Sequence, residues 1–257
     1  MLKQIFRLLA VLIFAFICCP LGSSLFAKDA PLVNGIDAKY PPFAYIAESG
    51  EAQGFDIDMI NWIAKKKGLS VVHQAFDWSS IVTNLKDKKL DLIASGLSVT
   101  AERAEQVTFS NPYWKVKQVV LVKADSPLTL DEVLKGGKTI GLQSGTSELA
   151  SMEKANGQDG RKYTITGFES ADMSIQDVIN GRIDAAVMND SKATEFLEKF
   201  PVKALGLAGI PDEDYAIAVN KESVELLKVL NEGLAEIQKD PIWAELIKKH
   251  QLIEPLF

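Results

Sequence analysis

The segment Lys89-Leu90-Asp91-Leu92-Ile93-Ala94 recurs later in the chain as Arg182-Ile183-Asp184-Ala185-Ala186-Val187. Each copy has a basic residue, an aliphatic residue, an aspartate and then an apolar run of the kind that is buried in a parallel sheet. A helical apolar face precedes each copy, formed by Ile81, Val82 and Leu85 in the first and by Ile175, Val178 and Ile179 in the second. The repeat predicts an α/β protein with two similar lobes.

The segments around the first copy complete a β-α-β-α-β pattern. Residues 31–37 predict a strand, and residues 56–67 predict an amphipathic helix that stops at Gly68. Ser79 is expected to cap the helix before the first copy. Strand-like segments at 117–123 and 214–219 predict two crossings between the lobes. The expected organisation is lobe 1 from 28–118 and 215–257, lobe 2 from 119–214, with the terminal helices 223–238 and 241–249 rejoining lobe 1.

Composition places the chain among folded globular proteins. Of its 257 residues, 47% are hydrophobic and 24% are charged, and the net charge is −6. A phosphate backbone would repel such a chain, which has no basic patch, so nucleic-acid binding is excluded as a default.

The amino terminus has the features of an export signal. Lys3 and Arg7 precede an apolar run, and a small residue, Ala27, ends the segment. We expect residues 1–27 to be a signal peptide, with cleavage near Ala27 and a periplasmic protein that is not embedded in the membrane. An uncleaved anchor is the alternative, but the run is shorter than the roughly 20 residues that span a bilayer. The only two cysteines, Cys18 and Cys19, lie in this segment, which excludes disulfides, thiol catalysis and Cys-ligated zinc in the mature chain.

The loops that follow the predicted strands carry the polar residues of interest. Ligands of open α/β sheets bind beyond the carboxyl ends of strands, so the loops after Asp37, Ala94, Leu142 and Val187 are expected to face one cleft. The second of these runs from 95 to 103 and ends in Arg103, which could hold a carboxylate with both arms of its guanidinium. The third, residues 143–148, opens a helix with a glycine and hydroxyl residues, as an anion site does. Ordinary helix capping is the alternative for either loop alone.

Seven segments, in order, carry a resemblance to a known family. They are Gly35 to Phe43, Gly54 to Asp58, Trp78 to Leu85, Ser95 to Arg103, Phe109 to Tyr113, Gln143 to Ser147 and Gly181 to Asp190. The mature chain resembles the family 3 extracellular solute-binding proteins, periplasmic receptors that deliver polar amino acids to ATP-driven importers. The resemblance implies the type II periplasmic binding protein fold, in which two lobes, each a mixed sheet flanked by helices, are joined by a two-strand hinge. It also implies a monomer that closes on an amino acid and docks on the permease subunits of an ABC transporter, with no cofactor.

The same resemblance implies a ligand site. In it Arg103 takes the α-carboxylate, helped by Ser98, the Gly96 N–H and Thr146, while Tyr40 and Trp78 form walls beside Asp37. The expected site residues are Asp37, Tyr40, Trp78, Ser95, Gly96, Ser98, Arg103, Thr146 and Asn189.

Asn189 departs from the family pattern, which places an aspartate there to hold the ligand's ammonium. An amide accepts a hydrogen bond but supplies no opposite charge. Three alternatives remain open: Asp190 holds the amine, Glu148 contributes, or the ligand is not an ordinary α-amino acid.

Other chemistries have little support in the sequence. His73 and His250 are expected to be surface or helix-end residues, and Walker, nucleophile-elbow and HExxH motifs are absent from the sequence. We therefore expect neither catalytic residues nor a metal site. The alternative functions are an enzyme on the same scaffold, similar to cyclohexadienyl dehydratase, and a sensor module, against which the lack of a later apolar span argues.

Overall fold

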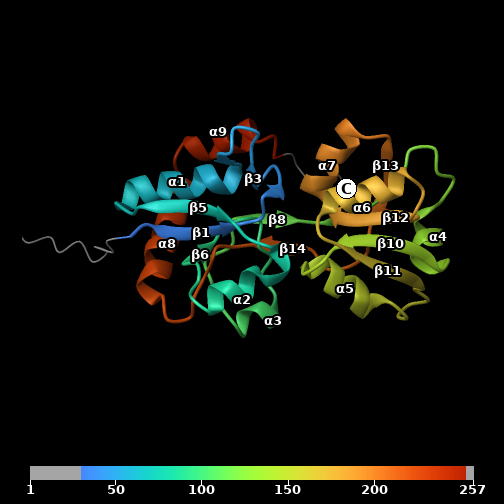
Figure 1. Cartoon of the computed structure of the whole chain (residues 1–257), viewed down its shortest axis with the longest axis horizontal. Helices are drawn as coiled ribbons and strands as arrows, with labels where there is room; N and C mark the ends of the chain where they lie inside the picture. The colour runs from blue at the N-terminus through green and yellow to red at the C-terminus, as the bar shows by residue number, and fades with distance from the viewer. Residues whose placement is uncertain (1–29, 253–257) are drawn as a thin grey trace, which may run out of the picture.

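The computed structural model describes residues 30–252, and the predicted signal peptide lies outside this range. Two five-stranded sheets lie at opposite ends of the molecule, each with its own helices (Figure 1). Sheet 1 has the order β5 (Val71–Ala75), β1 (Leu32–Ile36), β6 (Leu92–Ile93), β15 (Ala218–Val219), β7 (Thr108–Phe109). Sheet 2 has the order β11 (Tyr163–Phe168), β10 (Lys138–Gln143), β12 (Ala185–Asn189), β9 (Gln118–Lys123), β13 (Val202–Leu207).

The two sheets have the same pattern of strand directions. In sheet 1, β1 runs parallel to β5 and β6, and β15 pairs antiparallel with β6 and β7. In sheet 2, β10 runs parallel to β11 and β12, and β9 pairs antiparallel with β12 and β13. The two copies of the sequence repeat form β6 and β12, the middle strand of each sheet. This confirms the predicted α/β class with a mixed sheet in each half.

A two-stranded ribbon lies where the chain passes between the sheets. β8 (Trp114–Val116) pairs antiparallel with β14 (Glu213–Tyr215), just before β9 and just after β13. The segment 214–219, predicted as one strand, is divided between two elements: β14 belongs to the ribbon and β15 to sheet 1. We call the part built on sheet 1 lobe 1 and the part built on sheet 2 lobe 2.

Helices cover both sheets. In lobe 1, α1 (Phe55–Lys67) packs against α8 (Val224–Ile237) and α9 (Ile242–Lys249) over an apolar core that includes Phe55, Ile63 and Leu230. The two terminal helices therefore pack on lobe 1. A short β-meander, β2 (Lys39–Tyr40), β3 (Ala44–Ile46) and β4 (Ala52–Gln53), precedes α1. The rest of lobe 1 contains the 3-10 turn η1 (Trp78–Ser80), α2 (Ile81–Lys86) and α3 (Ala101–Ala104).

Lobe 2 has a core on each side of its sheet. α6 (Ala171–Ile179) and α7 (Asp190–Lys199) cover one face, around Ile175 and Phe196. α4 (Leu130–Lys135) and α5 (Ser147–Ala155) cover the other, around Val133 and Met152. Because both faces are covered, the inner strands β9 and β12 have continuous apolar runs, at 119–122 and 185–188, as the repeat predicts for β12.

Two helix ends test the sequence-based assignments. Gly68 ends α1 in the left-handed conformation, with φ 67°, as predicted. The prediction that Ser79 caps α2 is wrong, because Ser79 lies inside η1 and its own N–H is bound by Asp77 Oδ1 at 2.9 Å. The aspartate begins the turn two residues earlier and takes the capping role.

None of the helices described between residues 30 and 252 is long and apolar enough to cross a membrane.

Candidate functional site

A cavity lies between the lobes at the carboxyl ends of the parallel strands. Asp37 follows β1, Gly96 follows β6, and Gln143 and Asn189 end β10 and β12, so the four predicted loops meet there. The cavity and its mouth together contain about 470 Å³ not occupied by protein atoms, part of which is open to solvent. Its lining consists of Asp37, Tyr40, Trp78, Gly96, Ser98, Arg103, Gln143, Thr146, Ser147, Glu148, Ala171, Val187, Met188, Asn189, Lys192 and Tyr215.

Of the expected site residues, only Ser95 is not in this lining. Ser95 is fully buried, and its Oγ accepts a hydrogen bond from the Asp37 N–H at 3.0 Å. It fixes the backbone of Asp37 from behind the cavity wall.

Arg103 is held rigidly across the interface. It lies on α3, which Thr100 caps, and its Nη1 donates to Ser98 O at 2.8 Å in its own lobe. Its Nη2 donates to Gly145 O at 3.1 Å in lobe 2, and its guanidinium lies 6.0 Å from the Trp78 ring centre. Burial lowers the pKa of Arg103, and the nearby carboxylates of Glu148 and Glu213 oppose that effect.

The Gly96 N–H, expected to face the ligand, instead points into lobe 1. It donates to Asp56 Oδ2 at 2.6 Å, and Tyr113 OH donates to the same oxygen at 2.7 Å. Glycine is required here because φ is 61° and a Cβ would lie 2.5 Å from the Tyr40 ring.

Two serine hydroxyls of the lining share one carboxylate behind the cavity. Ser98 Oγ, from lobe 1, donates to Glu213 Oε2 at 2.5 Å, and Ser147 Oγ, from lobe 2, donates to it at 2.8 Å. Glu213 lies on ribbon strand β14. Burial, reinforced by the neighbouring charge of Glu148, raises the pKa of Glu213 to about 7.

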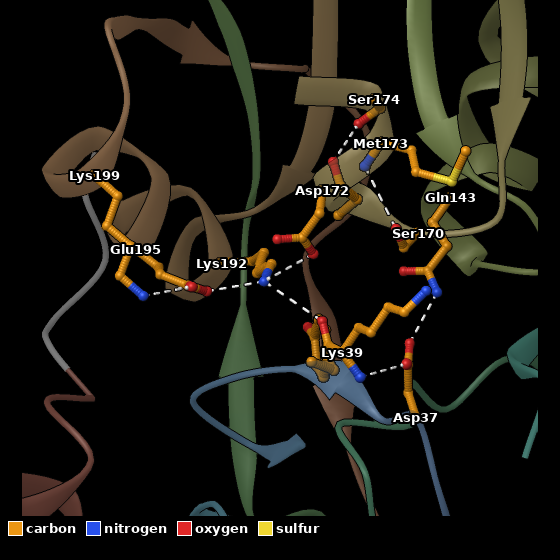
Figure 2. A network of polar contacts seen from close by, with 12 residues as sticks. Asp37, Lys39, Gln143, Ser170, Asp172, Met173, Ser174, Lys192, Glu195 and Lys199 are labelled. Carbon is orange, nitrogen blue, oxygen red and sulfur yellow. Dashed lines mark hydrogen bonds and ion pairs between the residues drawn. The ribbon is translucent and has the colours of Figure 1, made fainter. Parts of the chain in front are cut away.

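Asp37 and Asn189 reach the cavity from opposite lobes. Asp37 Oδ2 accepts from Gln143 Nε2 at 2.8 Å across the cleft (Figure 2). Asn189 Nδ2 donates to Tyr40 OH, and its Oδ1 accepts from Lys192 N at 2.9 Å, capping α7. Both ends of the Asn189 amide therefore already have partners.

Lys192 is a cation buried in the cavity wall. Its side chain is 1% exposed, and its Nζ lies 2.8 Å from Glu195 Oε2 and 3.4 Å from Asp172 Oδ2 (Figure 2). The same Nζ lies 3.5 Å from Lys39 O in lobe 1. Two carboxylates from its own lobe thus balance its charge.

The charges that remain in the lining are one guanidinium and two carboxylates. Arg103 supplies the positive charge, and Asp37 and Glu148 supply the negative charges. Asp190, considered for the ligand amine, is buried but does not line the cavity. Glu148, the other residue considered, does.

Sequence reasoning missed Lys192, Tyr215 and Glu213. Lys192 has a local signal, because it follows Asn189 by three positions on a first helical turn and therefore shares its face. Glu213 has none, because its partner Ser98 is 115 positions away.

Among residues 30–252, no group of three or more His, Cys, Asp or Glu side chains is arranged to hold a metal ion.

The family model for bacterial extracellular solute-binding proteins, family 3, matches residues 32–252. The arginine-binding extracellular protein ArtP of Bacillus subtilis is 32% identical over 255 residues, covering 93% of this chain and 94% of that protein. The lysine/arginine/ornithine-binding periplasmic protein of Escherichia coli is 30% identical over 241 residues, covering 89% and 90%. The structure of an ancestral arginine-binding protein bound to arginine superposes with a TM-score of 0.77 at 34% identity, covering 86% of this chain and 97% of that one.

Proposed function

Since the chain belongs to family 3 of the bacterial extracellular solute-binding proteins, we propose that it binds an amino acid with a cationic side chain, of the arginine type. The observation that carries this proposal is the set of charges in the cavity: one guanidinium and two carboxylates, with the remaining charged residue, Lys192, balanced by Glu195 and Asp172. A cationic amino acid has the complementary set, one carboxylate and two cations. Relatives named for arginine binding support the same choice.

In this proposal each charged group of the solute has a partner. Arg103 holds the α-carboxylate, and Asp37 and Glu148 hold the two cationic groups. Tyr40 and Trp78 cover the solute, which excludes water and strengthens the charge contacts. Asn189 contributes an amide rather than a charge, so it does not hold the ammonium alone.

Delivery of the solute to the permease subunits of an ABC transporter belongs to the same proposal. So do export to the periplasm with cleavage after Ala27 and action as a monomer. Relatives named for binding favour a receptor over the dehydratase-like enzyme considered from the sequence.

Calorimetric titration with arginine and with citrulline, its neutral counterpart of nearly equal shape, tests the ligand class. We expect arginine to bind at least about tenfold more tightly, because citrulline leaves a buried carboxylate without its opposite charge. Arg103→Ala should weaken arginine binding by about 30-fold to several thousand-fold, from a loss of about 2–5 kcal/mol.

Arg182→Ala is the matched control for this variant. Arg182 is exposed, with a partner in Asp177, and lies away from the cavity. Equal affinity for arginine and citrulline, or an Arg103→Ala protein that binds within about threefold of the parent, would contradict the proposal.

A further inference from the structure

Ser98, Ser147 and Glu213 meet beside the cavity. While Glu213 is ionised, the two serine hydroxyls donate to it and have no proton left to donate to a bound carboxylate. Each serine hydroxyl has one proton, and the nearest acceptor of both is Glu213 Oε2; the other acceptor of Ser147 Oγ is a second carboxylate oxygen, Glu148 Oε2 at 3.4 Å. The two hydroxyls then present only lone pairs to the cavity, and a carboxylate placed beside Ser98 meets an acceptor instead of a donor.

Protonation of Glu213 reverses this arrangement. The carboxylic acid O–H donates to one serine oxygen, and that serine can then turn its own proton toward the cavity. We propose that Glu213 takes up a proton from solvent when the solute's carboxylate binds beside Ser98, so that the receptor binds its solute together with a proton. This inference rests on the proposed function, because it requires a solute with a carboxylate at Arg103.

The surroundings of Glu213 allow the proton to be taken up near neutral pH. Burial and the charge of Glu148 on α5 raise its pKa to about 7, while Arg103 on α3 opposes them. Tyr40 on β2 and Tyr215 on β14 are the other titratable groups facing it, and burial raises the pKa of both phenols, so they stay neutral. The position opposite on β8 is the apolar Val116.

Glu213 also joins three parts of the molecule. Ser98 belongs to lobe 1, Ser147 to lobe 2 and Glu213 to the ribbon between them. Glu213 does not itself line the cavity. It is therefore a positioning residue, which acts on the solute through the serine hydroxyls.

The test is calorimetric titration with arginine in buffers of different ionisation enthalpy, from pH 6 to pH 8. The parent should take up a fraction of a proton per arginine near pH 7, because burial raises the pKa of Glu213 into this range and leaves the group partly ionised. Its affinity should fall by up to about tenfold per pH unit above that. Glu213→Gln, whose amide donates to a serine at every pH, should bind without proton uptake and with an affinity that does not change with pH.

Asp214→Asn is the matched control, on the same strand. Its carboxylate pairs with Lys115 Nζ at 2.8 Å and is about half exposed, so this variant should keep the proton uptake of the parent. Ser98→Ala provides a second variant, which should bind more weakly and lose the pH dependence.

Several results would overturn the proposal. Proton uptake that persists in Glu213→Gln would place the proton elsewhere, and affinity that rises with pH would mean that the serines face an ammonium group. If a carboxylate-bearing solute binds with the same affinity from pH 6 to pH 8, the Glu213 proposal fails alone. If arginine and the other common amino acids all fail to bind, the proposed function fails and the Glu213 proposal fails with it.

Discussion

At position 189 this chain has a neutral asparagine, whereas the family pattern described above has an aspartate. Its Oδ1 caps α7 by accepting from Lys192 N, and its Nδ2 donates to Tyr40 OH. Aspartate has the same shape and keeps the cap, while the Tyr40 hydroxyl can reverse and donate to it. The residue can therefore change charge without losing its structural role.

Asn189→Asp should bind arginine about tenfold more tightly, since it adds a third negative charge to the lining of a cavity that is proposed to hold two cationic groups. Thermal stability should stay close to that of the parent. Asp190→Asn is the control, because Asp190 lies outside the cavity lining, and its affinity should not change. Calorimetric titration of both variants with arginine measures the two affinities. Weaker binding by Asn189→Asp would show that the ammonium is held elsewhere.

For single residues, the sequence indicated which positions line the cavity better than it indicated their hydrogen-bond partners. Eight of the nine site residues that the family resemblance implied line the cavity, and the strand pattern placed their loops at the carboxyl ends of the strands. The direction of the Gly96 N–H was not predictable, because it depends on Asp56, 40 positions away. The partner of Ser98 was hidden for the same reason: Glu213 reaches it only after the chain has crossed both lobes.

Among the elements, α1 begins with a buried acid. Asp56 is 0% exposed, and its Oδ1 has no hydrogen-bond partner among the described residues. Burial raises the pKa of Asp56 to about 7, although hydrogen bonds from Tyr113 and Gly96 oppose the shift. The folded protein therefore holds this proton more tightly than the unfolded chain, where the ordinary value is 3.8. The stabilisation is complete below about pH 4 and is lost as the pH rises through about 7.

Asp56→Asn should remove that pH dependence. Between pH 4 and pH 8 the free energy of unfolding of the parent should fall by up to about 4 kcal/mol more than that of the variant. Urea unfolding at several pH values measures the difference.

Asp58→Asn is a control of opposite sign. Although burial raises the pKa of Asp58, hydrogen bonds from His250 and Lys249 lower it overall, so its contribution is lost as the pH falls. Parallel curves for the parent and Asp56→Asn would contradict the assignment.

Element types were predictable, and element ends less so. Of the repeat segment 89–94, only Leu92–Ile93 form a strand, because only these two residues pair with the neighbouring strands β1 and β15. Apolar runs predict burial well, but the length of a strand depends on which neighbour pairs with it.

For the whole molecule, Gly145 is a point where the lobes touch. A Cβ on Gly145 would lie 2.7 Å from Ser79 Cα in lobe 1, and its φ of 77° already favours glycine. Gly145 O also accepts from Arg103. A side chain here would collide with the backbone of the opposite lobe only while the lobes are together.

Gly145→Ala should therefore weaken arginine binding by about tenfold or more, and small-angle scattering should find a larger radius of gyration at the same arginine concentration. Gly137→Ala is the matched control. It has a similar φ of 72° in lobe 2 but nothing within 4 Å of the added Cβ, so it has the backbone strain without the collision. Equal losses of affinity in the two variants would assign the effect to strain rather than to closure.

The order of the strands along the chain also determines which sheet can be completed first during synthesis. Sheet 2 is complete once the chain has been made through Leu207, but sheet 1 lacks β15, which lies between β6 and β7, until Val219 has been added. The helices α8 and α9 that cover the core of lobe 1 come later still. Lobe 1, which contains the first of the described strands, is therefore the last whose sheet and helical cover can be completed. Sheet 2 can thus be completed first in synthesis, whereas sheet 1 has to wait until most of the chain has been made.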